Sequence, residues 1–200
     1  MATKSTSEEK LVTTALIAIE KSGWASLSLV SIARKAKVPL SELYELCPTK
    51  RALLSLIAKR IDVTFLSLPA TQDIAVPVRD RVFEAILGWF ECMEPLRPAL
   101  SVIHEEGASD IGTIIDIIPV TMRSAHWIAE CATIPSTGWQ GFIAIRTIGL
   151  ILAETMSVWL KDGKDLSKTM AHIDRRLRTL EEWSNNLNRI GSILNASSED

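Results

Sequence analysis

The chain has 200 residues, a formal net charge of −2 and 47% apolar residues, a composition typical of a globular protein and not of a disordered one. This near-neutral balance provides no overall positive field, so composition alone argues against a nucleic-acid-binding protein. The polar first ten residues predict no signal peptide, and the apolar window Trp139–Ala153 is expected to be too short to span a membrane. Cys47, Cys92 and Cys131 form no CxxC pair, so they indicate neither a zinc site nor a disulfide framework and fit a reducing cytosol.

The N-terminal region has the apolar spacing of a helix. Leu11, Ala15 and Ile19 follow one another at intervals of four residues, which predicts an amphipathic helix. Ser7 is expected to cap this helix, and Gly23 is expected to end it.

Three further helices are expected before residue 68. One runs from near Ser28 to Ala36, and after a turn at Lys37 another runs from Pro39 to about Cys47. Thr49 is expected to cap the next helix, whose apolar stripe is Leu54, Ile57, Ile61, Phe65 and Leu68. The middle pair of short helices has the dimensions of a helix-turn-helix, a unit that places its second helix in the DNA major groove.

The rest of the chain predicts longer helices. A proline-containing linker follows residue 68, and helices are expected near 78–93, 96–106, 109–132 (bent at Pro119) and 139–160. The 139–160 helix is apolar almost all round, so it should be covered on most sides. The last helix has the stripe Leu166, Met170, Ile173, Leu177, Leu180, Trp183, Leu187, Ile190 and Leu194. No strand pattern is found, which predicts an all-α protein of about nine helices divided into domains 1–68 and 69–200.

The first of these domains resembles the DNA-binding domain of the TetR family of bacterial repressors. The residues that carry the resemblance are Ala15, Gly23, Leu29, Ile32, Ala33, Val38, Leu43, Tyr44, Lys50, Leu53 and Leu54. The resemblance implies a cytoplasmic, homodimeric regulator, most simply a repressor, that binds palindromic operator DNA. It implies DNA contacts from Ser28, Lys37, Pro39, Ser41, Glu42, Tyr44 and Lys50, with Lys50 holding phosphate through its backbone and side chain.

Charge is distributed in agreement with this division. Residues 1–62 contain ten basic and six acidic side chains, whereas the remainder contains twelve basic and eighteen acidic ones. The expected DNA-binding end is therefore positive and the rest is negative. The segment Pro39–Leu46 departs from this trend, because it contains Glu42 and Glu45 and no basic residue.

The same resemblance implies a ligand site and a dimer surface in the second domain. The predicted ligand is a small apolar molecule, and its expected site residues are Trp89, Phe90, Met93, His104, Met122, His126, Trp127 and Phe142. The expected dimer interface, formed by the last two helices, contains Trp139, Ile143, Leu150, Ile151, Met170, Ile173 and Leu177.

The sequence also bears on two other classes of function. No GxGxxG, GxSxG, P-loop or HExxH motif is present, and the histidines lack metal-ligand spacing, so no enzyme, cofactor or metal site is predicted. The alternative that stays open is a binding protein with the TetR fold that does not bind DNA, similar to the lipid-binding family of ubiquinone biosynthesis. Glu42, Glu45 and Cys47, which differ from the usual DNA-binding pattern, favour that alternative.

Overall fold

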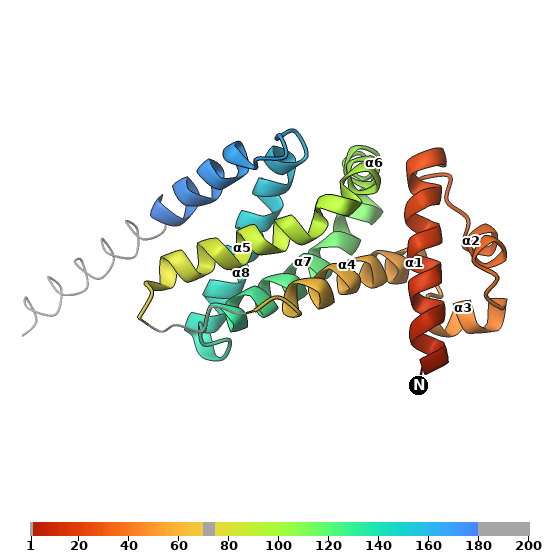
Figure 1. The fold of residues 1–200 in the computed structure, drawn as a ribbon, viewed down its shortest axis with the longest axis horizontal. Coiled ribbons are helices and arrows are strands. Elements are labelled where there is room, and N and C mark those ends of the chain that lie inside the picture. The colour runs from red at the N-terminus through yellow and green to blue at the C-terminus, as the bar shows by residue number, and fades with distance from the viewer. Residues whose placement is uncertain (1, 70–74, 180–200) are drawn as a thin grey trace, which may run out of the picture. The chain divides into compact units, whose positions relative to one another are not determined.

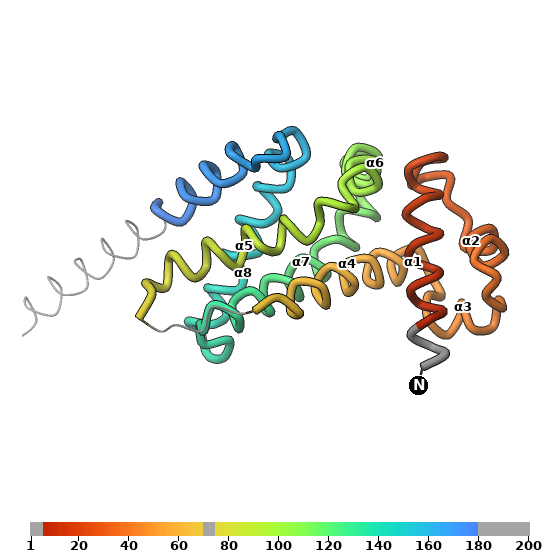
Figure 2. Tube along the Cα trace, viewed as in Figure 1, coloured from red at the N-terminus to blue at the C-terminus, as the bar shows by residue number. Residues whose placement is uncertain are grey.

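A computed structural model describes residues 2–69 and 75–179 of the chain, and these contain no β-strand (Figure 1). Eight α-helices are assigned there: α1 (Ala2–Ser22), α2 (Leu29–Ala36), α3 (Leu40–Leu46), α4 (Lys50–Leu66), α5 (Val78–Met93), α6 (Arg97–Gly107), α7 (Ile111–Cys131) and α8 (Gly138–Trp159). A one-turn 3₁₀ helix, η1 (Glu94–Leu96), precedes α6, and residues 167–179 are helical as well (Figure 2). The all-α prediction is confirmed, with a helix number close to the predicted one.

The helices form two compact units. The first unit comprises Met1–Ala70 and Trp89–Trp127, and the second comprises Thr71–Gly88 and Ile128–Asp200. Helices α5 and α7 therefore each contribute residues to both units. The predicted domain 1–68 lies inside the first unit, and the predicted boundary at residue 68 stays a prediction.

Helix α1 buries the predicted stripe, because Leu11, Ala15 and Ile19 are at most 1% exposed. The helix ends before Gly23, whose φ of 86° is a conformation that glycine adopts without steric cost. The predicted cap at Ser7 is wrong. Helix α1 begins at Ala2, so Ser7 lies within it and is buried against the core.

The helix-turn-helix formed by α2 and α3 is defined by local capping. The Ser28 side chain accepts a hydrogen bond from the Ser31 N–H at 3.4 Å at the start of α2. Lys37 ends α2 in the left-handed region, at φ 55°, and its N–H bonds the carbonyls of Ala33 and Arg34. Pro39 is the residue before α3, where its missing N–H leaves no helical hydrogen bond unmade.

Helix α4 begins as the sequence predicts. Thr49 Oγ1 accepts from the Ala52 N–H at 3.1 Å, which satisfies one of the free donors of the first turn. Four of the five predicted stripe residues, Leu54, Ile57, Ile61 and Phe65, are buried. The fifth, Leu68, follows the end of the helix and is 43% exposed.

Helix α8 is covered on one face only within the chain. Ile148, Ile151, Leu152, Thr155 and Trp159 are buried, whereas Trp139, Phe142, Ile143 and Leu150 are each more than half exposed. A single copy of the chain therefore covers only one face of this helix, and the cover of its other side stays a prediction.

The sequence predicts that this apolar segment is too short to span a membrane, and for α8 that prediction is wrong. The helix has 22 residues, with a mean hydropathy of 1.5 over its most apolar window, so it is long and apolar enough to cross a bilayer. A buried core helix passes the same test, and one such helix in the described residues is weak support for a membrane span.

Beyond α8, Leu166 has φ 52° and precedes the helical residues 167–179. Leu166, Ile173 and Leu177 of the predicted stripe are buried, whereas Met170 is 39% exposed. The stripe members Leu180, Trp183, Leu187, Ile190 and Leu194 lie outside the described residues.

The left-handed conformation of Lys37 generates a stability prediction. A residue with a Cβ atom adopts this conformation at a cost of about 1 kcal/mol. Glycine avoids this steric cost but loses more chain entropy on folding, so its net advantage is smaller. We therefore expect Lys37→Gly to unfold with a free energy about 0.5 kcal/mol higher than that of Lys37→Ala, as measured by urea titration. Both variants lack the lysine charge, so equal stabilities would contradict a strained turn.

Candidate nucleic-acid interface

Helix α3 presents one face to solvent and packs the other against its neighbours. Leu43 and Cys47 are 7% and 1% exposed and anchor the helix. Tyr44 is 71% exposed, and Ser41 lies on the exposed side with it. An exposed aromatic side chain beside a hydroxyl, on a helix held from behind, has the form of a groove-reading surface.

The remaining predicted contact residues differ in exposure. Ser28, Lys37 and Pro39 are exposed, whereas Glu42 is half-buried. An open groove of about 470 Å³ lies beside α2 and is lined by Thr6, Glu9, Lys10, Thr13, Thr14, Lys35, Ala36 and Lys37. The groove contains three lysines and one glutamate, so it carries a net positive charge, whereas α3 carries none.

Lys50 has a structural role that the sequence did not indicate. Its Nζ donates to the carbonyls of Trp24 and Ala25 at 3.1 and 2.8 Å and lies 5.6 Å from the centre of the Trp24 ring. The ammonium group therefore fastens the segment between α1 and α2 to the start of α4. The same segment is held from α6, because Glu106 Oε2 accepts from the Ala25 N–H at 2.7 Å.

Cys47 has the character of a core residue and not of a reactive thiol. Burial raises the pKa of its thiol to about 11, and the protonated thiol donates a hydrogen bond to the Thr49 carbonyl at 3.3 Å. At neutral pH the thiol is therefore protonated and unreactive. Its small side chain fills the space beneath α3.

No protein-family model and no curated protein matches the sequence. Among the solved structures that match is the crystal structure of the TetR transcriptional regulator from Nitrosomonas europaea ATCC 19718. Its TM-score is 0.64 at 19% identity, over 88% of this chain and 98% of that chain. A putative TetR-family transcriptional regulator from Mesorhizobium loti MAFF303099 matches with a TM-score of 0.51 at 16% identity, over 88% and 95% of the two chains.

The chain has the TetR fold. The resemblance seen in the sequence is thereby confirmed at the level of the fold. At these identities the likeness does not transfer ligands, operators or site residues.

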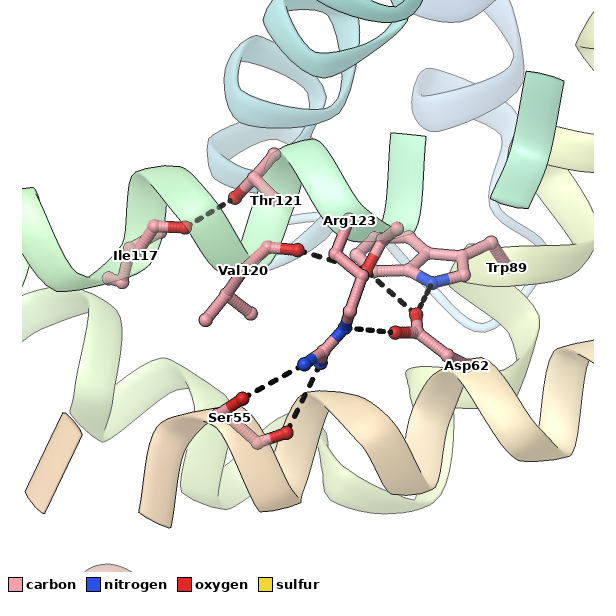
Figure 3. Close-up of polar contacts among 8 residues, drawn as sticks. Ser55, Asp62, Trp89, Ile117, Val120, Thr121 and Arg123 are labelled. Atoms are coloured by element: carbon pink, nitrogen blue, oxygen red, sulfur yellow. Dashed lines mark hydrogen bonds and ion pairs between the residues drawn. The ribbon is translucent and has the colours of Figure 1, made fainter. Parts of the chain in front are cut away.

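A buried carboxylate joins three helices of this TetR fold, and the sequence analysis missed it (Figure 3). Asp62 on α4 is 5% exposed. Its Oδ1 accepts from Trp89 Nε1 of α5 at 3.1 Å and from Ser124 Oγ of α7 at 2.7 Å. Its Oδ2 accepts from Arg123 Nε at 3.2 Å, and the same guanidinium donates to the hydroxyl and carbonyl oxygens of Ser55 at 2.9 and 3.2 Å. An Asp on the apolar stripe of a helix is the one sequence signal that could have indicated it, since a buried carboxylate requires partners.

Of the predicted ligand residues, Trp89 contacts this carboxylate directly. Trp89, Phe90 and Met93 are at most 5% exposed, and the rings of Trp89 and Phe90 meet edge to face with centroids 5.3 Å apart. His104, Met122 and His126 are half-buried. Trp127 is 42% exposed and lies edge to face with His126, 5.8 Å between centroids. Phe142 belongs to the second unit, where the Arg146 guanidinium lies 4.0 Å from its ring centre.

The predicted dimer residues divide into two groups. Trp139, Ile143, Leu150 and Met170 are exposed and available to a partner. Ile151, Ile173 and Leu177 are buried in the core of the second unit, where they pack within one chain.

The burial of Asp62 predicts a strong dependence of stability on its charge. We expect Asp62→Asn to lower the free energy of unfolding by about 3 kcal/mol, because the change leaves Arg123 without its buried counter-charge. Chemical denaturation measures this loss.

Asp116→Asn is the matched control, because Asp116 also pairs with an arginine, Arg51, whose side chain is 60% exposed. The control should cost at most about 1 kcal/mol. Equal losses in the two variants would show that burial of Asp62 does not set its contribution.

Proposed function

We propose that the protein is a TetR-like transcriptional regulator, most simply a repressor, that binds a palindromic operator as a homodimer and responds to a small apolar ligand. The observation that carries the proposal is the helix-turn-helix, in which Leu43 and Cys47 anchor α3 while Ser41 and Tyr44 remain exposed. The proposal requires no catalytic residue, metal or cofactor, and it places the protein in the bacterial cytoplasm.

Phosphate binding is assigned to residues around α3 and not to α3 itself. The side chains of Arg34, Lys35 and Lys37 are exposed at the end of α2 and can neutralise phosphates beside the major groove. Glu42 and Glu45 on α3 repel phosphate, but a glutamate can accept a hydrogen bond from the cytosine amino group. A cytosine at the contacted position of the operator is the base that suits this helix.

Lys50 is proposed to support DNA binding by fixing the start of α4, and not by contacting a phosphate with its ammonium group. Its Nζ already contacts two carbonyl oxygens, so its ammonium group serves mainly to fix the start of α4. The N–H groups of that first turn carry the partial positive charge that attracts a phosphate.

The exposed apolar face of α8 is proposed to pack against the same face of a second copy. Trp139, Ile143 and Leu150 recur at helical spacing on this face, and Met170 adds an exposed apolar side chain from residues 167–179. A self-complementary patch of this kind generates a two-fold dimer, which matches the symmetry of a palindromic operator.

Ligand response is proposed to pass through Asp62. This carboxylate joins α4, which follows the helix-turn-helix directly, to α5 and α7, which carry most of the predicted ligand residues. A ligand that favours one arrangement of α7 over another would thereby favour one position of α4. The two recognition helices of the dimer would then fit or fail to fit successive major grooves.

The experiment that tests the proposal is a mobility-shift titration with the DNA that flanks the protein's own gene, at several salt concentrations. We expect a specific complex whose affinity falls steeply with salt. The absence of a specific complex, together with lipid that co-purifies with the protein, would favour the alternative function as a lipid-binding protein.

The acidic residues of α3 give a direct test of whether this helix approaches the DNA duplex. Glu42→Lys combined with Glu45→Lys should strengthen non-specific DNA binding and steepen the slope of log affinity against log salt by about 2, one for each new phosphate contact. Asp165→Lys is the control, because it adds positive charge at an exposed turn of the second unit. If the double variant and the control behave alike, α3 does not approach the duplex.

The α8 face gives a test of assembly. Leu150→Arg should raise the dimer dissociation constant about 30-fold or more, because a central interface side chain contributes about 2 kcal/mol. Size-exclusion chromatography with light scattering measures the change. Ile17→Arg, at an exposed position of α1, should leave the dimer intact. A wild-type chain that is monomeric at micromolar concentration would overturn the homodimer.

A further inference from the structure

The exposed face of α3 carries a leucine that is absent from the DNA contacts expected from the sequence. Leu40, the first residue of α3, is 53% exposed, whereas Leu43 of the same helix is buried. Tyr44 is exposed one turn after Leu40, so the two side chains are neighbours on the helix surface. Pro39, directly before the helix, is exposed as well. Pro39, Leu40 and Tyr44 therefore form an apolar patch at the start of α3.

The polar side chains of α3 lie beside this apolar patch. Ser41 and Glu45 are both exposed and are also four residues apart, so they form a second line on the same face. Glu42 and Leu46 are half-buried and form a third line, on the side of the helix that turns toward the chain. The solvent-facing surface of α3 thus consists of one apolar line and one polar line, and Glu45 supplies the charge of the polar line.

The chemistry of this surface limits the base edges that it can contact. Guanine offers only acceptors to the major groove and is read best by arginine or lysine, neither of which occurs in α3. A carboxylate has no proton to donate to such an edge, so Glu45 does not suit guanine. Thymine is different, because its C5-methyl group is an apolar contact that needs no charge and no hydrogen bond. A leucine on the surface of α3 is therefore matched to thymine.

The position of Leu40 in the helix-turn-helix agrees with such a contact. In this motif the N-terminal residues of the second helix contact the base edges, and Leu40 is the N-terminal residue of α3. Tyr44 lies about 6 Å further along the helix axis. Because a base-pair step is about 3.4 Å, the apolar patch spans about two base pairs. The buried Leu43 and Cys47 hold the helix from the opposite side.

We propose that Leu40 contacts the C5-methyl group of a thymine in each half-site of the operator, with the Tyr44 ring beside it. The contact removes two apolar groups from water and thereby contributes to affinity. It also makes Leu40 a specificity-determining residue, since cytosine has no methyl group at this position.

The inference rests on the proposed function, because it names one base that the regulator reads. The alternative is an exposed leucine with no contact, which is a common feature of protein surfaces. The two differ in one measurable respect. Loss of the leucine side chain changes the preference for thymine only if Leu40 reaches the methyl group.

The test compares two forms of the DNA fragment that flanks the protein's own gene, one with thymidine and one with deoxyuridine throughout, which differ only in the C5-methyl group. Burial of one methyl group raises affinity about fourfold, and a dimer buries one in each half-site. We therefore expect the wild-type chain to bind the thymidine fragment on the order of tenfold more tightly in a mobility-shift titration.

Leu40→Ser removes the apolar side chain from the start of α3. It should lower the affinity for the thymidine fragment about tenfold and leave the affinity for the deoxyuridine fragment nearly unchanged, so that the preference is lost. Leu66→Ser is the matched control, because Leu66 is an exposed leucine at the end of α4. The control should retain the wild-type preference. Both leucines are exposed, so both variants should melt close to the wild-type temperature.

Three results would overturn the inference: no preference in the wild-type chain, an unchanged preference in Leu40→Ser, or an equal loss of affinity for both fragments in Leu40→Ser. The last result would show that Leu40 supports the helix and does not read the methyl group.

The outcome is separable from that of the proposed function. A wild-type chain that forms the same specific complex with both fragments overturns this inference alone. A chain that forms no specific complex with either fragment overturns the regulator as well.

Discussion

The buried carboxylate of Asp62 is the constraint on which the first unit depends. Its oxygens accept from Trp89, Ser124 and Arg123, so α4, α5 and α7 must stand in one register for all three bonds to form. A carboxylate in an apolar environment is costly when any of these donors is withdrawn. Apolar contacts alone would tolerate sliding of the helices, whereas this network admits few arrangements. The helix that follows the helix-turn-helix is thereby connected to the helices behind it through a single satisfied charge.

In the helix-turn-helix, charge and shape are provided by different elements. Helix α3 supplies the shape, with Tyr44 and Ser41 outward, but it carries two glutamates and no base. The positive charge is located in neighbouring elements, at the end of α2 and along the groove that Lys10 and Lys35 line. Under the proposed function, affinity would come from contacts with backbone phosphates beside α3, and α3 itself would discriminate between bases. The acidic segment therefore does not by itself argue against DNA binding.

Local rules account for what the sequence could predict. The caps at Ser28 and Thr49 and the buried stripes of α1 and α4 depend on residues a few positions apart, and they were predicted correctly. The missed features depend on distant residues. The inward engagement of Lys50 requires two carbonyls more than twenty positions away, and the Asp62 network requires three helices to be assembled. Helix α8 shows the same limit, because its uniformly apolar composition does not reveal which face one chain leaves exposed.

Asp62 and Arg81 show two different ways in which this fold buries a charge. Both side chains are at least nine-tenths buried, and each lies on a helix of the TetR fold. Asp62 has a donor for each of its oxygens, which is the state expected of a charge that stabilises the fold. Arg81 differs, because its Nε and Nη1 have no hydrogen-bond partner among the residues that the structure describes. A buried charge without a partner lowers stability, so Arg81 opposes the stability of the second unit where Asp62 supports that of the first.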